Sequence, residues 1–325
     1  GDVYKRQLFL TAIDKYGHEL WRWTFPVDKL NQTNEVFSPL SGKATYSETE
    51  NELTVKAKNH TFIFSKRDGQ LKGVSVNNHK ISFANGPRFI GARRADRSLD
   101  QFYNHDDEKA KEKDRTYSEF PDAAVFTKLE VKEDGGNLIV TANYKLGNLD
   151  KAQWTINPNG EAALDYTYNF SGVVDLIGIS FDYPEDQVIS KRWLGAGPYR
   201  VWQNRIHGTQ YDVWENDYND PIPGETFTYP EFKGYFDSVS WMNIRTKEGT
   251  ISLTNETPDS YIGVYQPRDG RDRLLYTLPE SGISVLDVIP PVRNKVNSTD
   301  LCGPSSQPKW VNGPQTGRII FRFME

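Results

Sequence analysis

Carboxylates are the side chains of this sequence whose number and spacing could do acid–base chemistry. Five of them gather in one aromatic, turn-rich stretch, at Glu215, Asp217, Asp220, Glu225 and Glu231. A retaining glycosidase needs two carboxyl groups about 5 Å apart, in environments that separate their pKa values. A polar loop rim explains the same stretch without catalysis, because ordinary surface carboxylates lack the shifted pKa values that catalysis requires. We therefore assign no catalytic residue.

Composition excludes several other classes of protein. The 325 residues carry a net charge of −5 with no basic block, which does not indicate a nucleic-acid partner. The only cysteine is Cys302, so an internal disulfide framework and a cysteine-based zinc site are excluded, and we expect neither a metal nor a cofactor. No run of residues is apolar enough to span a bilayer, so no membrane partner is expected.

Period-two alternation of apolar residues dominates the chain and predicts an all-β, antiparallel fold. Turn residues separate paired runs, as in β-hairpins. The predicted pairs are Leu129–Val131 with Leu138–Tyr144, Trp154–Ile156 with Ala162–Phe170, Thr61–Ser65 with Val74–Val76, and Trp241–Arg245 with Ile251–Thr254. Ile319, Phe321 and Phe323 alternate with Arg318 and Arg322, which predicts a last strand with one core face. Strand–helix alternation is lacking, so the sequence does not indicate a TIM barrel.

Three stretches depart from this pattern. Leu8 to Phe25 indicates two short strands around a turn, and a lone hairpin cannot bury its own core. Residues 26–51 lack periodicity and are interpreted as a linker or domain boundary. Residues 106–115 are charged at every position but Ala110, which is typical of a solvated loop or a short surface helix, and residues 91–115 are predicted to be the most mobile internal loop.

Residues 193–205 carry the most specific motif, Trp-Leu-Gly-Ala-Gly-Pro-Tyr-Arg-Val-Trp-Gln-Asn-Arg. Its glycines and proline suit a tight turn between strands. Together with Tyr229 to Tyr235 and Gly86 to Asp96, it resembles the C-terminal small domain of β-galactosidases in glycoside hydrolase family 2. The resemblance covers about residues 45–325. One departure is that Ala92 or Arg93 stands where the family has a Trp, which favours a divergent subfamily whose sugar need not be galactose.

The resemblance implies an antiparallel β-supersandwich, like that of galactose mutarotase, preceded by a short remnant of an Ig-like β-domain. It divides the chain into residues 1–7 as a tag or read artefact, residues 8–36 as the remnant and linker, and residues 37–325 as the small-chain domain. Its expected partners are a β-galactoside or related glycan and the catalytic barrel that carries the family's carboxylates. The module itself would be inactive. A bacterial, periplasmic or extracellular location is favoured over the cytoplasm, although no leader-like segment is present to decide it.

Trp310 has the sharpest functional interpretation. Asp300 to Pro304 and the following Lys309-Trp310 resemble a family loop whose Trp forms an apolar platform for the substrate at the mouth of the barrel. The loop is about two residues longer here, and a rim aromatic packed on its own domain is the alternative. Trp202, Arg205 and Glu231, in the other matching segments, are further sugar-facing candidates.

Two other functions stay open. A free-standing carbohydrate-binding module could use Trp193, Trp202 and Trp214, although core packing explains clustered tryptophans as well. An aldose 1-epimerase would need a histidine acid and a glutamate base meeting one sugar ring. Of the histidines at positions 18, 60, 79, 105 and 207, only His207 lies near a motif, and a packing role explains it equally.

Overall fold

The computed structural model describes residues 7–27, 41–94, 117–217, 234–257, 259–264, 282–291 and 303–325. Within these ranges the chain forms strands and two short 3₁₀ turns, η1 (Glu185–Gln187) and η4 (Pro304–Ser306), with no α-helix. Every pairing between the described strands is antiparallel. The predicted all-β class is confirmed.

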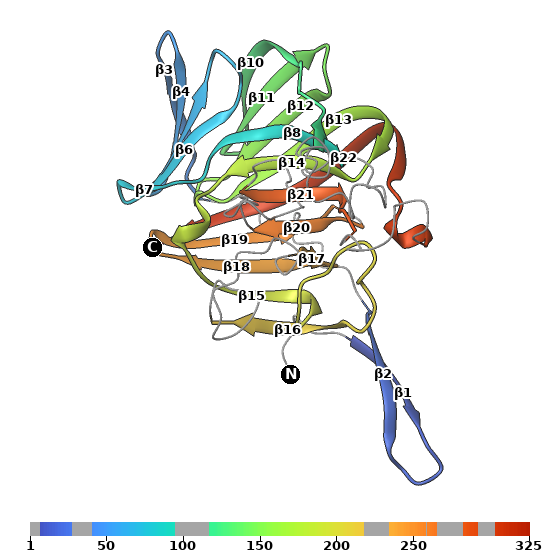
Figure 1. Ribbon diagram of the computed structural model, residues 1–325. Helices are drawn as coiled ribbons and strands as arrows, with labels where there is room; N and C mark the ends of the chain where they lie inside the picture. The colour runs from blue at the N-terminus through green and yellow to red at the C-terminus, as the bar shows by residue number, and fades with distance from the viewer. Residues whose placement is uncertain are drawn as a thin grey trace.

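Two large sheets make up most of the molecule (Figure 1). The nine-stranded sheet has the order β10 (Val125–Asp134), β11 (Asn137–Lys145), β12 (Leu149–Ile156), β13 (Ala162–Val174), β22 (Lys309–Met324), β19 (Gly249–Asn255), β18 (Trp241–Thr246), β15 (Val188–Gly197) and β16 (Gln210–Asn216). The eleven-stranded sheet has the order β17 (Phe236–Asp237), β20 (Tyr261–Val264), β21 (Ile283–Val288), β14 (Leu176–Asp182), β8 (Ala84–Arg94), β6 (Leu71–Val76), β5 (His60–Ser65), β4 (Glu52–Ala57) and β3 (Thr45–Glu48), with β7 (His79–Ile81) on β6 and β9 (Tyr117–Glu119) on β8. All four hairpins predicted within this sandwich are present, as β10–β11, β12–β13, β5–β6 and β18–β19.

The core lies between the inner faces of the two sheets and is rich in aromatic rings. Phe83, which precedes β8, and Phe181 of β14 stack at 4.5 Å between centroids. Phe321 from β22 lies 5.1 Å from Phe83, and Trp154 from β12 lies 5.9 Å from Phe321. Each of these side chains is almost fully buried, and burial of one such side chain stabilises the fold by roughly 1.5–3 kcal/mol. Alternation therefore places the apolar side chains between the two sheets, as the predicted supersandwich requires.

The last strand also follows its predicted alternation. Ile319, Phe321 and Phe323 are buried in the core, whereas Arg318 and Arg322 lie on the outer face. There Arg322 pairs with Glu161 at 2.6 Å.

A separate hairpin of β1 (Gln7–Ile13) and β2 (Glu19–Pro26) projects from the sandwich (Figure 1). Asp14 organises its turn, because its carboxylate accepts the backbone N–H groups of Tyr16 and His18. These hydrogen bonds favour the charged form and lower the pKa of Asp14. The hairpin meets the sandwich edge at β16, where the N–H of Tyr211 donates to Thr24 Oγ1 at 2.6 Å.

Three sequence-based interpretations need correction. Residues 45–48 are not linker but form β3, an edge strand paired with β4. Gly195 and Gly197 do not make a turn but lie within β15. Close neighbours require glycine at both positions. A Cβ at Gly197 would lie 2.4 Å from the ring of Trp214, and one at Gly195 would lie 3.0 Å from the carbonyl oxygen of Asp237. Of the mobile loop predicted at 91–115, residues 91–94 instead belong to β8 and pair with β14 and β9, whereas the rest, with the charged run 106–115, lies outside the described residues.

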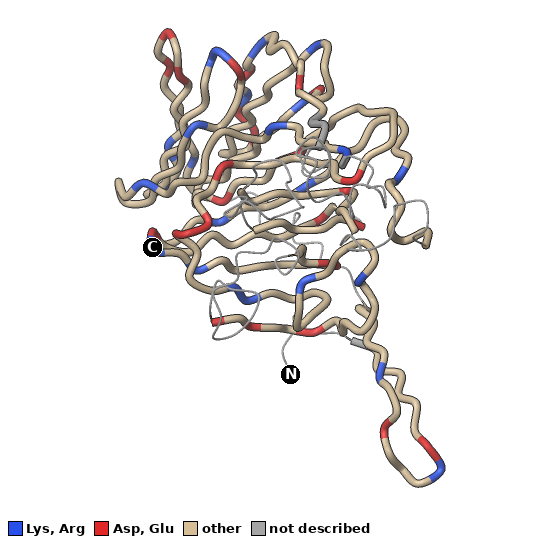
Figure 2. The backbone as a smooth tube through the Cα atoms, viewed as in Figure 1, with Lys and Arg blue, Asp and Glu red and all other residues tan. Residues whose placement is uncertain are grey.

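Basic and acidic residues are interspersed along the described backbone (Figure 2). In the part of the chain that the structure describes, no helix has the length and hydropathy to cross a membrane.

Candidate functional site

Trp310 lies on a long two-stranded ribbon rather than in the loop that the sequence indicated. It is the second residue of β22 and faces Val173 of β13 across the pair. The register between β13 and β22 runs unbroken from Ala162 to Val174. Because side chains alternate along a strand, Val311 faces the core and Trp310 faces away from it. The Trp310 side chain is consequently 69% exposed although its backbone is held by a ladder.

The turn before Trp310 is fastened to the segment that carries two other sequence candidates. The Gln203 side-chain amide donates to the carbonyl oxygen of Gln307 at 2.8 Å, and that of Asn204 donates to Ser306 Oγ at 3.1 Å. The Gln203 backbone N–H donates to the carbonyl oxygen of Pro290 at 3.1 Å. The fold thus brings the 202–205 turn and the start of β22 together, although about 100 residues separate them.

Trp202 and Arg205 have opposite environments within that turn. The indole of Trp202 is 3% exposed and packs edge-on against Tyr235 at 5.5 Å, in a second apolar cluster with Val201 and Leu286. A ring covered in this way presents no face to a sugar, so Trp202 is corrected to a packing residue. Arg205 has an exposed side chain, and its backbone N–H donates to the Trp202 carbonyl oxygen at 2.7 Å. Arg205 therefore stays a sugar-facing candidate. Glu231 lies outside the described residues.

The tryptophans proposed for a binding module do not form a surface. Trp193 is 1% exposed and packs against Phe236 at 4.9 Å. Trp214 is half-buried, and its indole N–H donates to the carbonyl oxygen of Gln210 at 3.0 Å. Core packing therefore explains both.

The described histidines that lie near a carboxylate are on the surface, and His18 meets Asp14 at 3.1 Å in the exposed turn of the β1–β2 hairpin rather than in a pocket. His60 is tied to the carbonyl oxygen of Phe323 at 2.8 Å, and His207 is exposed. His79 lies 4.0 Å from Glu325, but both side chains are on the open surface. Glu215 is exposed, with Arg192 at 3.9 Å. Over the described segments no group of three or more His, Cys, Asp or Glu side chains could hold a metal.

One partly buried acid joins the two sheets. Asp287 on β21 accepts a short hydrogen bond from the Tyr168 hydroxyl on β13. Burial raises the pKa of Asp287, and the hydrogen bond from Tyr168 opposes that rise. Burial raises the pKa of Tyr168 as well, and the neighbouring carboxylate adds to that rise. A perturbed acid can mark a site, but this one points into the sandwich and serves to connect its layers.

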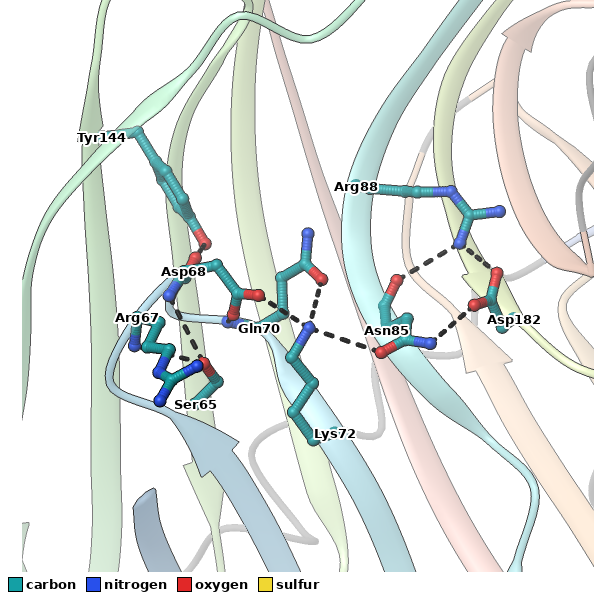
Figure 3. Close-up of polar contacts among 9 residues, drawn as sticks. All are labelled: Ser65, Arg67, Asp68, Gln70, Lys72, Asn85, Arg88, Tyr144 and Asp182. Carbon is teal, nitrogen blue, oxygen red and sulfur yellow. Dashed lines mark hydrogen bonds and ion pairs between the residues drawn. The ribbon is translucent and has the colours of Figure 1, made fainter. Parts of the chain in front are cut away.

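A chain of polar contacts crosses the eleven-stranded sheet at the turn between β5 and β6 (Figure 3). Lys72 is at its centre, with its Nζ 2.7 Å from Asp68 Oδ2, 3.0 Å from Gln70 Oε1 and 3.3 Å from Asn85 Oδ1. Asn85 donates to Asp182 at 2.7 Å, and Arg88 pairs with the same carboxylate. The pairs satisfy one another's charges, and no sequence motif indicated this network.

The described part of the chain is a β-sandwich in which two sheets pack over an aromatic core and Trp310 is exposed on the β13–β22 ribbon. Within that part, no catalytic pair of carboxylates is present. The model of the beta galactosidase small chain family matches residues 56–282, and the chain belongs to that family. No curated protein matches the chain.

Solved structures with similarity include the galactose 1-epimerase from Lactobacillus acidophilus NCFM, with a TM-score of 0.49 and 10% identity, over 88% of this chain and 99% of that chain. A putative mutarotase, YeaD, from Salmonella typhimurium gives a TM-score of 0.38 and 9% identity over 90% and 99%. A galactose mutarotase-like protein from Lactobacillus casei ATCC 334 gives 0.35 and 10% over 86% and 99%. Similarity at this level assigns no role to any residue.

Proposed function

We propose that this chain is the non-catalytic module of a family 2, β-galactosidase-type glycoside hydrolase, and that it braces the catalytic barrel and supplies one wall of its substrate site. The observation that carries the proposal is Trp310, a large aromatic ring that is open to solvent on a rigid strand. A sugar stacks its C–H face on such a ring, and a ring fixed in advance loses little entropy on binding. Family membership supports the association with a larger catalytic partner and a carbohydrate.

The surface around Trp310 suits a wall of a wet sugar site. Val173 lies directly opposite and is half-buried, which extends the apolar patch by one side chain. The next pair on the same face is Ser171 and Asn312, joined at 2.8 Å, so polar groups follow the apolar platform. Arg205 on the neighbouring turn adds a charged hydrogen-bond donor. An apolar stacking face beside polar groups is what a hydroxylated ring requires.

The hairpin of β1 and β2 belongs, in this proposal, to a preceding Ig-like β-domain and not to the sandwich. Its apolar side chains are exposed on both faces, among them Leu8, Phe9, Leu10, Trp21 and Trp23. A two-stranded ribbon cannot cover two faces by itself, so another β-layer is needed to bury them.

The test is Trp310→Ala in the whole enzyme, expressed from the reading frame that contains this chain. Loss of one aromatic contact should weaken the binding free energy by about 1–3 kcal/mol, which lowers kcat/KM roughly 5- to 150-fold, mainly through a higher KM. Trp310→Tyr should restore part of the loss. Tyr46→Ala, which removes another exposed aromatic on the distant edge strand β3, should leave the kinetics unchanged.

The isolated chain provides the complementary measurements. It should not hydrolyse 4-nitrophenyl β-galactoside, and Trp310→Ala should change its stability by no more than about 0.5 kcal/mol. Unchanged kinetics in the whole enzyme, or a collapse of the isolated chain on removal of Trp310, would make Trp310 structural. Millimolar binding of sugar to the isolated chain, lost in Trp310→Ala, would favour the free-standing binding module.

A further inference from the structure

A cavity of about 510 Å³ lies beside β8, between the β5–β6 turn and the segment 120–126. It exists because β6 pairs with β8 at a single position, Leu71 with Gly86, while β8 continues beside β14 as far as Ala92. The two halves of the eleven-stranded sheet diverge beyond Gly86 and leave a gap. Its volume falls within the roughly 300–1,000 Å³ that is typical of small-molecule sites.

The edge of β8 presents backbone polar groups to this gap. The Gly91 carbonyl oxygen accepts the N–H of Phe120 at 2.8 Å, so the polar groups of Gly91 point away from β14. Successive residues of an antiparallel strand alternate in direction, and the register of β8 on β14 is regular from Phe89 to Gly91. The N–H and C=O of Phe89 therefore point to the same side as those of Gly91, toward the cavity. In the described part of the chain no strand pairs with Phe89 on this side.

The walls combine hydrogen-bonding groups with aromatic rings. Gln70 lines the cavity with its Oε1 already engaged by Lys72, which leaves the amide NH₂ group available within the described structure. Phe120, Phe126 and Tyr144 are half-buried and supply ring surface. An apolar ligand would strip water from the polar groups without replacing their hydrogen bonds.

The charges of the lining exclude a strongly charged ligand. Two arginines, Arg67 and Arg88, and two acids, Asp68 and Asp122, lie around the cavity. Arg88 is neutralised by Asp182, and Asp68 by Lys72. A ligand of either sign would meet like charges as well as opposite ones, so a neutral ligand with many hydroxyl groups fits best.

The walls are held in place before any ligand arrives. Asp122 Oδ1 accepts the N–H of Ala124 at 3.1 Å, and also those of Asn148 and Leu149. The β5–β6 turn is pressed onto β10 and β11, because a Cβ at Gly69 would lie 2.7 Å from both Phe126 and Ala142. Such preorganisation lowers the entropic cost of binding.

From this geometry we infer that the cavity is a carbohydrate-binding site of the module itself, separate from the Trp310 platform. A neutral mono- or disaccharide places hydroxyl groups on the Phe89 backbone and the Gln70 amide, and lays a C–H face on Phe120 and Phe126. The inference goes beyond the proposed function and does not depend on it.

The test is a titration of the full chain with lactose and with cellobiose, read by NMR from labelled methyl groups and indole N–H groups. Ile90 and Leu149 line the cavity and report it, and the Trp310 indole reports the other site. We expect saturable shifts at Ile90 and Leu149 with at least one of the two sugars. Gln70→Leu should weaken this binding at least fivefold, and Ala124→Phe, which fills the cavity, should abolish it. Gln153→Leu, on β12 and outside the lining, is the matched control and should bind like the wild type.

Several outcomes would overturn the inference. Shifts confined to the Trp310 indole would leave the proposed function standing and remove the cavity site. Linear shifts without saturation up to about 50 mM would show only nonspecific contact at that concentration. Equal binding by the wild type, Gln70→Leu and Ala124→Phe would place the sugar elsewhere. A circular dichroism melt of each variant confirms that a loss of binding is not a loss of fold.

Discussion

At several positions in this fold one additional side-chain atom would not fit, and Gly178 is the clearest case. It lies on β14 between β8 and β21, and a Cβ there would lie 2.1 Å from the Val285 carbonyl oxygen and 2.7 Å from Leu286 Cα. The obstacles are backbone atoms of a central strand, which cannot rotate away as a side chain can. The methyl group of an alanine is therefore incompatible with the observed strand spacing.

We predict that Gly178→Ala lowers the free energy of unfolding by about 3 kcal/mol or more, the upper range for overpacking. Gly73→Ala on β6 is the matched control, because a Cβ there meets nothing within 4 Å. That substitution should change stability by no more than about 1 kcal/mol. Urea unfolding followed by circular dichroism measures both, and equal midpoints for the two variants would contradict the prediction.

The sequence predicted the family of the chain better than it predicted the role of each residue in the motif. The motif at 193–205 identified the family, but its glycines suggested a turn, and the structure uses them for close approach to Trp214 and Asp237. Trp202 was a sugar-facing candidate, yet the cluster that buries it includes Leu286, a residue 84 positions away. No local pattern records such a neighbour. The backbone edge at Phe89 was equally hidden, because it depends on where another strand stops.

At the scale of the strands, neighbours in sequence were predictable and distant partners were not. Hairpins such as β12–β13 follow from alternation and a turn, both of which are local. The pairing of β13 with β22 joins residues about 150 positions apart, and many other strands share the same alternation. This pairing converts the expected loop at Trp310 into a strand, so the error in the loop prediction has a single cause.

The hairpin of β1 and β2 should open independently of the sandwich. Among the described strands, β1 and β2 pair only with each other, and their side chains are largely exposed. We predict that its amides exchange with deuterium well before those of Leu129 to Phe170. The edge pair β3–β4 provides a control, since it is also peripheral but has the core beneath it through Leu53 and Val55. Protection of the hairpin equal to that of β10–β13 would mean that it is part of the sandwich.

For the molecule as a whole, buried tyrosine side chains limit the stability of the fold at alkaline pH. Burial raises the pKa values of Tyr144, Tyr166, Tyr168 and Tyr183 above the ordinary value of 10.0. The folded state therefore keeps protons that the unfolded chain releases above about pH 10. The stabilisation is complete below pH 10 and is lost as the pH rises through the folded-state values.

We predict that the free energy of unfolding falls steadily between about pH 9.5 and 11.5. Urea titrations across this range, with phenolate absorbance recorded in parallel, measure the effect. Tyr166→Phe should reduce the slope, because it removes one of the tyrosines whose pKa burial raises. A stability that is constant across the range, or phenolate absorbance from these groups before unfolding, would contradict the assignment.

The continuous register of β13 and β22 restricts how evolution can alter the Trp310 ribbon. Insertion or deletion of one residue between Trp310 and Gly317 would turn the indole to the opposite face of the ribbon, where Val311 now lies. A change of two residues keeps the indole on its present face and moves it along the strand by about 6.8 Å. Length changes in even steps are therefore a simple means for related chains to fit the same aromatic to substrate sites of different depth.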